Sequence, residues 1–395
     1  MNTARGYFTG LSRNTFLLAL SSLFADISTG MIVPVLPIFL TQTLKVSASV
    51  VGLVEGLAGA AQYLTQGLSG SLSDTLQKRK PIALVGYFLA AIGKPLMGLA
   101  PVWQGVLGGR LLDRFGAGTR SPPRDALIAS SVDEAHRGKA FGLEGVGDNA
   151  GAFLGPLLAI LLLVVWHLPI RLMFYLAVIP GLLAFLMVVL VREQPVKTTA
   201  TAKIDIRAAR FPKAYWKYLL ATALFGIGNS SNAFLILETK DIGASLTTTI
   251  LIYAGFDLVA ALISYPAGFL SDRLGRRNLL VLSITVFFIT YLGFALTRAV
   301  AIVGVLFVLY GLYQGTIRSV GKALASDYVS DPLRASAIGW YNATLGICGM
   351  VASLLGGWLW DHVGPTAVFL LGAVFAAVGM IACVALIPAV VTRDA

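Results

Sequence analysis

Long apolar runs alternate with short polar or basic segments along the whole chain. Apolar runs of membrane-spanning length lie near residues 16–40, 49–72, 82–100, 103–119, 139–165 and 171–191, and again near 215–237, 247–270, 279–297, 301–317, 335–360 and 366–388. A helix needs about 20 apolar residues to cross a bilayer. The pattern therefore predicts an all-α membrane protein of twelve helices, with a six-helix bundle over 1–191, a polar linker over 192–214 and a second six-helix bundle over 215–395.

The composition supports a membrane protein. Of the 395 residues, 57% are hydrophobic and only 12% are charged, and the mean hydropathy is +0.81, which excludes an ordinary soluble globule. The net charge of +11 does not call for a nucleic acid, because most Lys and Arg fall on the loops of one side if the N-terminus is cytoplasmic. We therefore expect a cell inner (plasma) membrane protein with both termini in the cytoplasm and no nucleic-acid partner.

A loop motif occurs once in each half of the chain. The complete copy, GFLSDRLGRR, runs from Gly268 to Arg277, and the copy GSLSDTLQKRK begins 198 residues earlier, at Gly70. Both keep the glycine, a leucine, an aspartate and a basic cluster at one spacing. The earlier copy has Gln77 in place of the internal glycine. A second pair, HRGKAFG at 136–142 and LRASAIG at 333–339, supports two similar halves in tandem.

The repeated loop resembles the signature loop of the major facilitator superfamily. The resemblance implies two six-helix bundles that rock about a central site, with basic residues of the 70–80 loop pairing with an acid in RSPPRDA (120–126) to form a latch in one of the alternating states. The residues of this gating motif are Gly70, Asp74, Arg79, Asp125, Gly268, Asp272 and Arg276. An alternative explanation covers the arginines of these loops but not the aspartates: they are ordinary positive charges that set the orientation of the chain in the membrane.

Asp26 is the sharpest functional candidate. It lies ten residues after Phe16, about 15 Å into the first helix, near the middle of the bilayer. We expect Pro34 and Pro37 to interrupt the outer half of that helix. A charge at that depth costs at least ~2.5 to 3.5 kcal/mol, so it is a functional candidate by default. Its stretch, LFADISTGMIVPVLPIFL, resembles the first helix of tetracycline/proton antiporters and related efflux proteins. By that resemblance Asp26 binds a proton or a cationic substrate group; capping of a neighbouring helix is the structural alternative.

More intramembrane charges lie in the third and fourth helices. Arg110, Asp113 and Arg114 are spaced so that the acid can pair along one helix face. Arg110 sits where the superfamily often has R-x-x-Q-G, with Asp113 and Arg114 in place of the glutamine and glycine. Lys94 is a candidate partner for Asp26 or Glu55. Two roles remain open for these charged residues: they contact the substrate directly, or they form a network that only fixes helix packing.

Further polar groups mark the remaining helices. Asp148 precedes the run from Gly151 to Pro156, which resembles the G-x-x-x-G-P motif of the antiporter branch. Nearby Glu144 is expected to pair with loop arginines. Asp257 lies near a midplane in the second half, where charge is otherwise sparse. Neutral polar candidates for the cavity are Asn229, Asn232, Gln314 and Asn342.

The sequence predicts a secondary active transporter. It has no P-loop for ATP, no H-E-x-x-H, no Cys/His metal cluster and no nucleophile motif, so we expect no enzyme, no cofactor and no metal. The expected partners are protons, a small-molecule substrate and the lipid bilayer, and the expected state is a monomer. Three functions remain: proton-coupled efflux of a small, partly apolar compound; uptake of an anionic solute or metal chelate at Lys94, Arg110 and Arg114; and a non-transporting sensor or lipid-handling protein.

Overall fold

The computed structural model describes residues 10–76, 78–133, 136–193, 211–329 and 333–387, and within them no strand occurs. The first half contains α2 (Arg13–Gly30), α3 (Leu36–Ile38), η1 (Phe39–Thr43), α4 (Ala48–Leu76), α5 (Arg79–Leu99), α6 (Trp103–Ser130), α7 (Arg137–Ile160), η3 (Leu161–Val165), α8 (Ile170–Leu176) and α9 (Val178–Val189). The second half contains α10 (Lys213–Gly226), α11 (Ala233–Asp241), α12 (Leu246–Leu274), α13 (Arg276–Leu296), α14 (Val300–Asp327), α15 (Arg334–His362) and α16 (Pro365–Leu386).

Each of the twelve predicted spans coincides with one helix or with consecutive helical segments. Eight helices in the described part are long and apolar enough to cross a membrane by length and composition. The other four runs are the first, second, fourth and seventh. The helices of the first and seventh runs are interrupted, the fourth carries the charges of Arg110, Asp113 and Arg114, and the second includes polar side chains such as Glu55.

The two interruptions have local causes. Helix α2 ends at Gly30, before Pro34 and Pro37, as the sequence leads one to expect because proline removes a helical hydrogen bond. The second break, over residues 227–232, was not predicted. It has the sequence Ile-Gly-Asn-Ser-Ser-Asn, in which glycine is flexible and the short polar side chains compete for backbone hydrogen bonds.

Other helix boundaries follow from capping. The side chains of Ser12 and Ser245 accept hydrogen bonds from the backbone N–H groups of Thr15 and Thr248, which starts α2 and α12. Between α12 and α13, Gly275 has a φ of 86°, a conformation that favours glycine. This requirement explains the internal glycine of the complete loop motif.

The chain divides into two compact units. One comprises residues 1–35 and 64–201, and the other comprises 36–63 and 202–395. Residues 36–63 belong with the second unit because the start of α4 packs on α15: the N–H groups of Ala48 and Ser49 donate to Asp361 at 3.0 and 2.8 Å. The division into bundles at the 192–214 linker stays a prediction.

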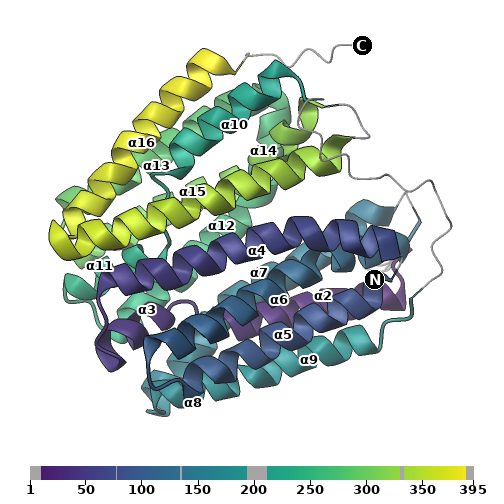
Figure 1. Cartoon of the computed structure of the whole chain (residues 1–395), viewed down its shortest axis with the longest axis horizontal. Coiled ribbons are helices and arrows are strands. Elements are labelled where there is room, and N and C mark those ends of the chain that lie inside the picture. The colour runs from purple at the N-terminus through teal and green to yellow at the C-terminus, as the bar shows by residue number, and fades with distance from the viewer. Residues whose placement is uncertain (1–9, 77, 134–135, 194–210, 330–332, 388–395) are drawn as a thin grey trace, which may run out of the picture. The chain divides into compact units, whose positions relative to one another are not determined.

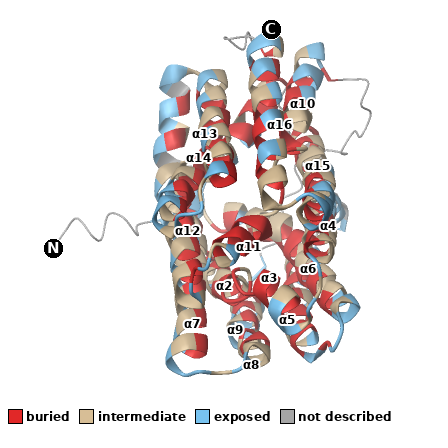
Figure 2. Ribbon diagram, turned by 90° about the vertical axis from the view of Figure 1, so that its left-hand side faces the viewer, coloured by how far each residue is buried: buried red, intermediate tan, exposed pale blue. Residues whose placement is uncertain are grey.

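Each unit buries a core and exposes apolar side chains on its outside. In the first unit the core includes Leu18, Tyr87, Ile128 and Val188. In the second, α13 and α16 lie side by side (Figure 1) and enclose stacked rings such as Phe287 and Tyr291, 3.9 Å apart. Many helices carry buried residues along one face and exposed ones along another (Figure 2). Exposed leucines are what a lipid-facing surface requires.

Candidate functional site

Helices α5 and α6 of the first unit lie side by side (Figure 1). They approach closely because glycines face each other across their interface. A Cβ atom on Gly93 would lie 2.6 Å from the carbonyl oxygen of Gly109, and one on Gly109 would lie 2.7 Å from that of Gly93. Both distances are too short for a side chain, so larger residues would force the helices apart. The close approach brings Lys94 of α5 onto Asp113 of α6.

Asp113 is surrounded by three cationic side chains. Lys94 Nζ lies 2.9 Å from Asp113 Oδ1, Arg110 Nη1 lies 3.2 Å from Oδ2, and Arg114 Nη2 lies 2.8 Å from Oδ2. The Asp113 side chain is 1% exposed, and that of Lys94 is 3% exposed. Three cations and one carboxylate give these four side chains a formal charge of 3 − 1 = +2. The carboxylate is thus held ionised by its neighbours, and the group keeps an affinity for negative charge.

The structure gives Lys94 and Asp26 partners other than those expected. Lys94 donates to Asp113 and to the carbonyl oxygen of Ala90, rather than to Asp26 or Glu55. Asp26 is paired instead with Arg120, whose Nη2 lies 3.6 Å from Asp26 Oδ1. Arg110 and Arg120 are ten residues apart, about 15 Å along α6. The arginine suggested by the superfamily pattern and the arginine that contacts Asp26 are therefore different residues.

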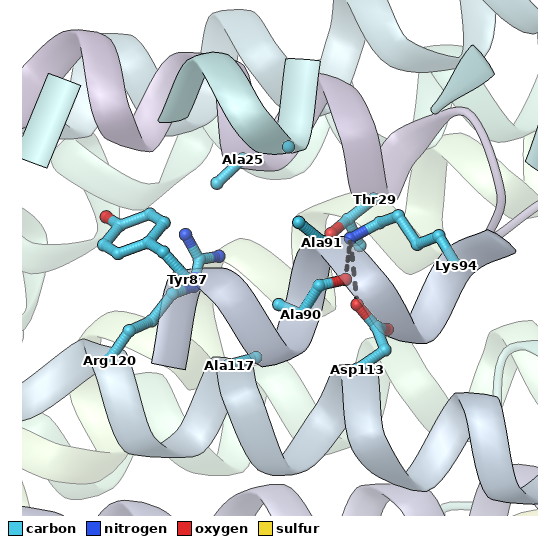
Figure 3. Close-up of a pocket in the computed structure, with 10 residues that line it drawn as sticks. Ala25, Thr29, Tyr87, Ala90, Ala91, Lys94, Asp113, Ala117 and Arg120 are labelled. Carbon is cyan, nitrogen blue, oxygen red and sulfur yellow. Dashed lines mark hydrogen bonds and ion pairs between the residues drawn. The ribbon is translucent and has the colours of Figure 1, made fainter. Parts of the chain in front are cut away.

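Arg120 is held by aromatic and ionic contacts. Its guanidinium lies 4.6 Å from the ring centroid of Tyr87, which is a cation–π distance. Figure 3 shows the two side chains next to each other. The Tyr87 hydroxyl is hydrogen-bonded to Ser21 of α2 at 2.9 Å. Within the described residues, Arg120 Nε and Nη1 are buried without a hydrogen-bond partner. Two of its donors thus remain available while a third faces Asp26.

A small cavity lies between the Arg120 and Lys94 groups (Figure 3). Its volume is about 10 Å³, and its polar lining comes from Thr29, Tyr87, Lys94, Asp113 and Arg120. A cavity of that size has room for roughly one water molecule. It can hydrate the charged groups but is too small for a substrate in this conformation.

Arg124, one turn beyond Arg120, joins α6 to α7. Its Nη2 lies 2.7 Å from Glu144 Oε1 and 3.0 Å from Asp125 Oδ1, and its Nη1 lies 3.5 Å from Asp148 Oδ1. Ser22 of α2 accepts a hydrogen bond from Arg124 and donates one to Glu144. Glu144 was expected to pair with loop arginines; it does pair with an arginine, but Arg124 lies within helix α6. Asp148, a predicted site residue, belongs to the same network.

Close packing of α2 on α7 completes this arrangement. A Cβ atom on Gly151 would lie 2.5 Å from the carbonyl oxygen of Leu23, and one on Gly155 would lie 2.7 Å from the Cα atom of Gly30. The G-x-x-x-G-P run therefore lets α7 lie directly against the helix that carries Asp26. Charged groups of α2, α6 and α7 are in this way gathered into one interior.

The interior of the second unit is polar but largely uncharged. Asn229 and Asn232, in the break between α10 and α11, are hydrogen-bonded to the hydroxyls of Tyr313 and Tyr310 on α14, at 3.0 and 2.8 Å. Both tyrosines are 1% exposed. The break frees backbone from the helix, and the two amides fix it to α14. The sequence identified the asparagines but not these tyrosine partners.

The remaining predicted site residues are more dispersed. Glu55 lies on α4 and Asp257 on α12, both partly buried. Gln314 is partly buried on α14, and Asn342 is buried on α15 with its Oδ1 atom unpaired in the described part. Glu55 falls in the second unit, whereas Lys94 falls in the first.

The gating loops are only partly described. Arg79 Nη1 donates to the carbonyl oxygen of Ala126 at 3.3 Å, next to Asp125. In the second half, Arg276 Nη1 lies 2.6 Å from Asp327 Oδ2. Gly70 lies in α4 and Gly268 in α12, while the side chains of Asp74 and Asp272 lie outside the described residues. The latch stays a prediction.

The sequence predicted that the fourth helix ends near residue 119, before RSPPRDA (120–126), and this boundary is wrong. Helix α6 continues to Ser130 through Pro122 and Pro123, and the two arginines of that stretch are only 7% and 9% exposed. The proline pair looked like the end of the helix, yet the helix passes through it. One signal in the sequence could have shown that the helix continues: Arg120 and Arg124 are four residues apart, a spacing that places both side chains on one face of a helix.

Comparison with known proteins agrees with the fold and the repeat. The Major Facilitator Superfamily model matches residues 18–237 and again residues 218–394. The chain is 32% identical to an uncharacterized MFS-type transporter of Methanocaldococcus jannaschii, with 93% of each protein covered. It is 26% identical to the multidrug resistance protein MdtG of Enterobacter lignolyticus over 87% of this chain and 84% of that protein. The crystal structure of the nucleoside transporter NupG has the same fold, with a TM-score of 0.75 at 16% identity, covering 95% of this chain and 98% of that one. The predicted fold class is confirmed, and the chain belongs to the Major Facilitator Superfamily of membrane transporters.

Proposed function

We propose that this transporter exports a small, partly apolar compound in exchange for protons. It acts by alternating access, as a monomer in the cell inner (plasma) membrane with both termini in the cytoplasm. The observation that carries the proposal is the ion pair between Asp26 of α2 and the buried Arg120 of α6. The Asp26 side chain is 29% exposed, so protons can reach it, while Arg120 is held in place by Tyr87.

The pair can couple proton binding to a change in helix contacts. Ionised Asp26 is attracted to Arg120, and this attraction draws α2 towards α6. A proton on the carboxylate removes one of the two charges and weakens the contact. A cationic group of a substrate competes for the same carboxylate. Proton and substrate therefore exclude each other at Asp26, which is what an exchanger requires.

Ion pairs on either side of the Asp26–Arg120 contact hold helix α6 to its neighbouring helices. Arg124, Glu144 and Asp148 link α6 to α7 one turn away. Asp113 and its three cations tie α6 to α5. Ionic contacts that hold α6 on both sides let a change at Asp26 act on α2 rather than on the whole unit. Similarity to a multidrug resistance protein supports efflux as the direction.

The test replaces Asp26 by asparagine, which keeps the shape and removes the charge. Purified Asp26→Asn is reconstituted in liposomes, and ethidium, an aromatic cation, serves as a fluorescent efflux probe under an imposed pH gradient. We expect gradient-driven export to be lost while the protein remains folded by thermal denaturation. Asp133→Asn, which changes an exposed carboxylate of the same unit, is the matched control and should export as the unmodified protein does. Equal export by Asp26→Asn would refute the proposal.

Uptake of an anionic solute or metal chelate is the second candidate function. The observation in its favour is the formal charge of +2 on Lys94, Arg110, Asp113 and Arg114. Liposomes of defined orientation separate the two candidates, because accumulation of an organic anion such as citrate inside right-side-out vesicles occurs only with uptake. Arg114 is the cation to replace first: its side chain is 14% exposed, more than those of Lys94 and Arg110.

A further inference from the structure

Glu238 is a buried carboxylate that no step of the proposed exchange uses. It lies on α11, directly after the apolar run 215–237, and its side chain is 1% exposed. Its Oε1 atom lies 2.7 Å from Arg298 Nη1, whereas its Oε2 atom is buried and has no hydrogen-bond partner in the described residues. A fully ionised carboxylate with one oxygen unsolvated is costly, and a proton on that oxygen relieves the cost.

The partner of Glu238 is exposed to water. The Arg298 side chain is 58% exposed, in the connection between α13 and α14, and its Nη2 also donates to Thr366 at the start of α16, at 3.3 Å. Water screens an exposed cation, so Arg298 compensates the charge of Glu238 only in part. Arg298 thus clamps α11 to the start of α16 through a contact that depends on the charge of Glu238.

Other charged groups near α11 are already engaged or face elsewhere. Lys240 donates to the carbonyl oxygen of Ala244 at 2.8 Å, and Asp241 is exposed and adds negative charge beside Glu238. On α15, Asp361 accepts from the backbone of Ala48 and Ser49, and His362 stacks on Trp358.

Two further elements pack on α11. They are α12, whose titratable groups include Tyr253 and Asp257, and α3, which has none. Arg298 is therefore the cation placed to balance Glu238 among the described groups.

We propose that Glu238 is a second proton-binding site of this transporter, which takes up a proton at the end of the second unit opposite the linker and thereby loosens the Arg298 clamp on α11. The site goes beyond the exchange proposed at Asp26 and does not depend on it. Helix α11 follows the break that carries Asn229 and Asn232, so a looser clamp acts on the polar groups of this unit. We expect this end to face the outside of the cell, since seven predicted spans, the last over 215–237, lie between the cytoplasmic N-terminus and Glu238, and seven is an odd number of crossings.

The titration of Glu238 has a defined direction. Burial raises the pKa of its carboxyl to about 7, although the charge of Arg298 acts to lower it. The folded protein therefore holds this proton at a pH where the unfolded chain has lost it. Stability gained from this group is present at low pH and falls as the pH rises from the ordinary value of a glutamate towards about 7.

Infrared difference spectroscopy tests the site directly on the reconstituted, substrate-free protein. Spectra at about pH 5 and about pH 8, on either side of the expected transition, report the C=O band of protonated carboxyls. We expect a component of this band to be lost in Glu238→Gln and retained in Asp241→Asn, the matched exposed control. An unchanged band in Glu238→Gln would overturn the proposal.

A second variant keeps the test valid if Glu238→Gln fails to fold. Arg298→Gln changes a mostly exposed side chain and removes the cation beside Glu238, so the midpoint of the band should move to higher pH. A midpoint unchanged in Arg298→Gln would also refute the site. Because these measurements need no transport, loss of the Asp26 proposal leaves them unaffected, and their failure leaves Asp26 untouched.

Discussion

The interiors of the two units use different chemistry to satisfy buried polar groups. The first unit gathers charges: Asp26 with Arg120, Asp113 with three cations, and Arg124 with acids of α7. The second unit pairs neutral amides with tyrosine hydroxyls, as in Asn229 with Tyr313 and Asn232 with Tyr310. The ion pair between buried Glu238 and the mostly exposed Arg298 lies at one end of this unit rather than among these amides. The contrast teaches that two units of one chain can satisfy their buried polar groups in different ways, by ion pairs in one and mainly by neutral hydrogen bonds in the other.

The charged interior should be the more fragile of the two. Asp113→Asn removes the one carboxylate that Lys94, Arg110 and Arg114 share and leaves three cations together. Breaking a buried ion pair by removing one partner costs about 3–5 kcal/mol. We expect a loss of that order in the free energy of unfolding, measured by detergent titration in mixed micelles. Asp133→Asn, an exposed control, should change little, and an equal effect in both variants would remove the distinction.

Transport should distinguish the arginine suggested by the family pattern from the one that contacts Asp26. Arg120→Gln removes the partner of Asp26, whereas Arg110→Gln leaves that pair intact. We expect Arg120→Gln to lower proton-driven export of ethidium about tenfold, which corresponds to about 1.4 kcal/mol, and to alter its pH profile. In Arg110→Gln the rate can fall but the shape of the pH profile should stay. The reverse result would show that the family pattern, rather than the observed contact, locates the coupling.

The neutral interior should tolerate change best. Tyr310→Phe removes the hydroxyl that donates to Asn232 Oδ1 at 2.8 Å. A neutral hydrogen bond contributes about 0.5–1.5 kcal/mol, and Asn232 is only partly buried, so we expect a loss near about 1 kcal/mol. The same detergent titration measures it. A loss as large as that of Asp113→Asn would mean that the two interiors do not differ in the proposed way.

Much of the architecture could be read along the chain. The apolar runs predicted each of the twelve spans, because a bilayer imposes one length of apolar helix on every crossing. The loop copies at 70–80 and 268–277 predicted two similar halves. The proline-rich end of the first run predicted that α2 would break. Asp26, Asp113 and Asp148 could be singled out as well, because a charge inside an apolar run is conspicuous by itself.

Pairings between helices could not be read in this way. The partner of Asp26 is Arg120, and that of Lys94 is Asp113, because those choices depend on how far α6 continues past Pro122 and on how closely Gly93 and Gly109 let two helices approach. Glu238 escaped notice because it stands at the end of an apolar run, where a charge is ordinary; only packing makes it buried. The sequence by itself determined the spans, the repeat and the presence of intramembrane charge, which are properties of local composition. The tertiary structure decided which charges meet. A contact between helices depends on their register and separation, and neither quantity can be deduced from the sequence of a single helix.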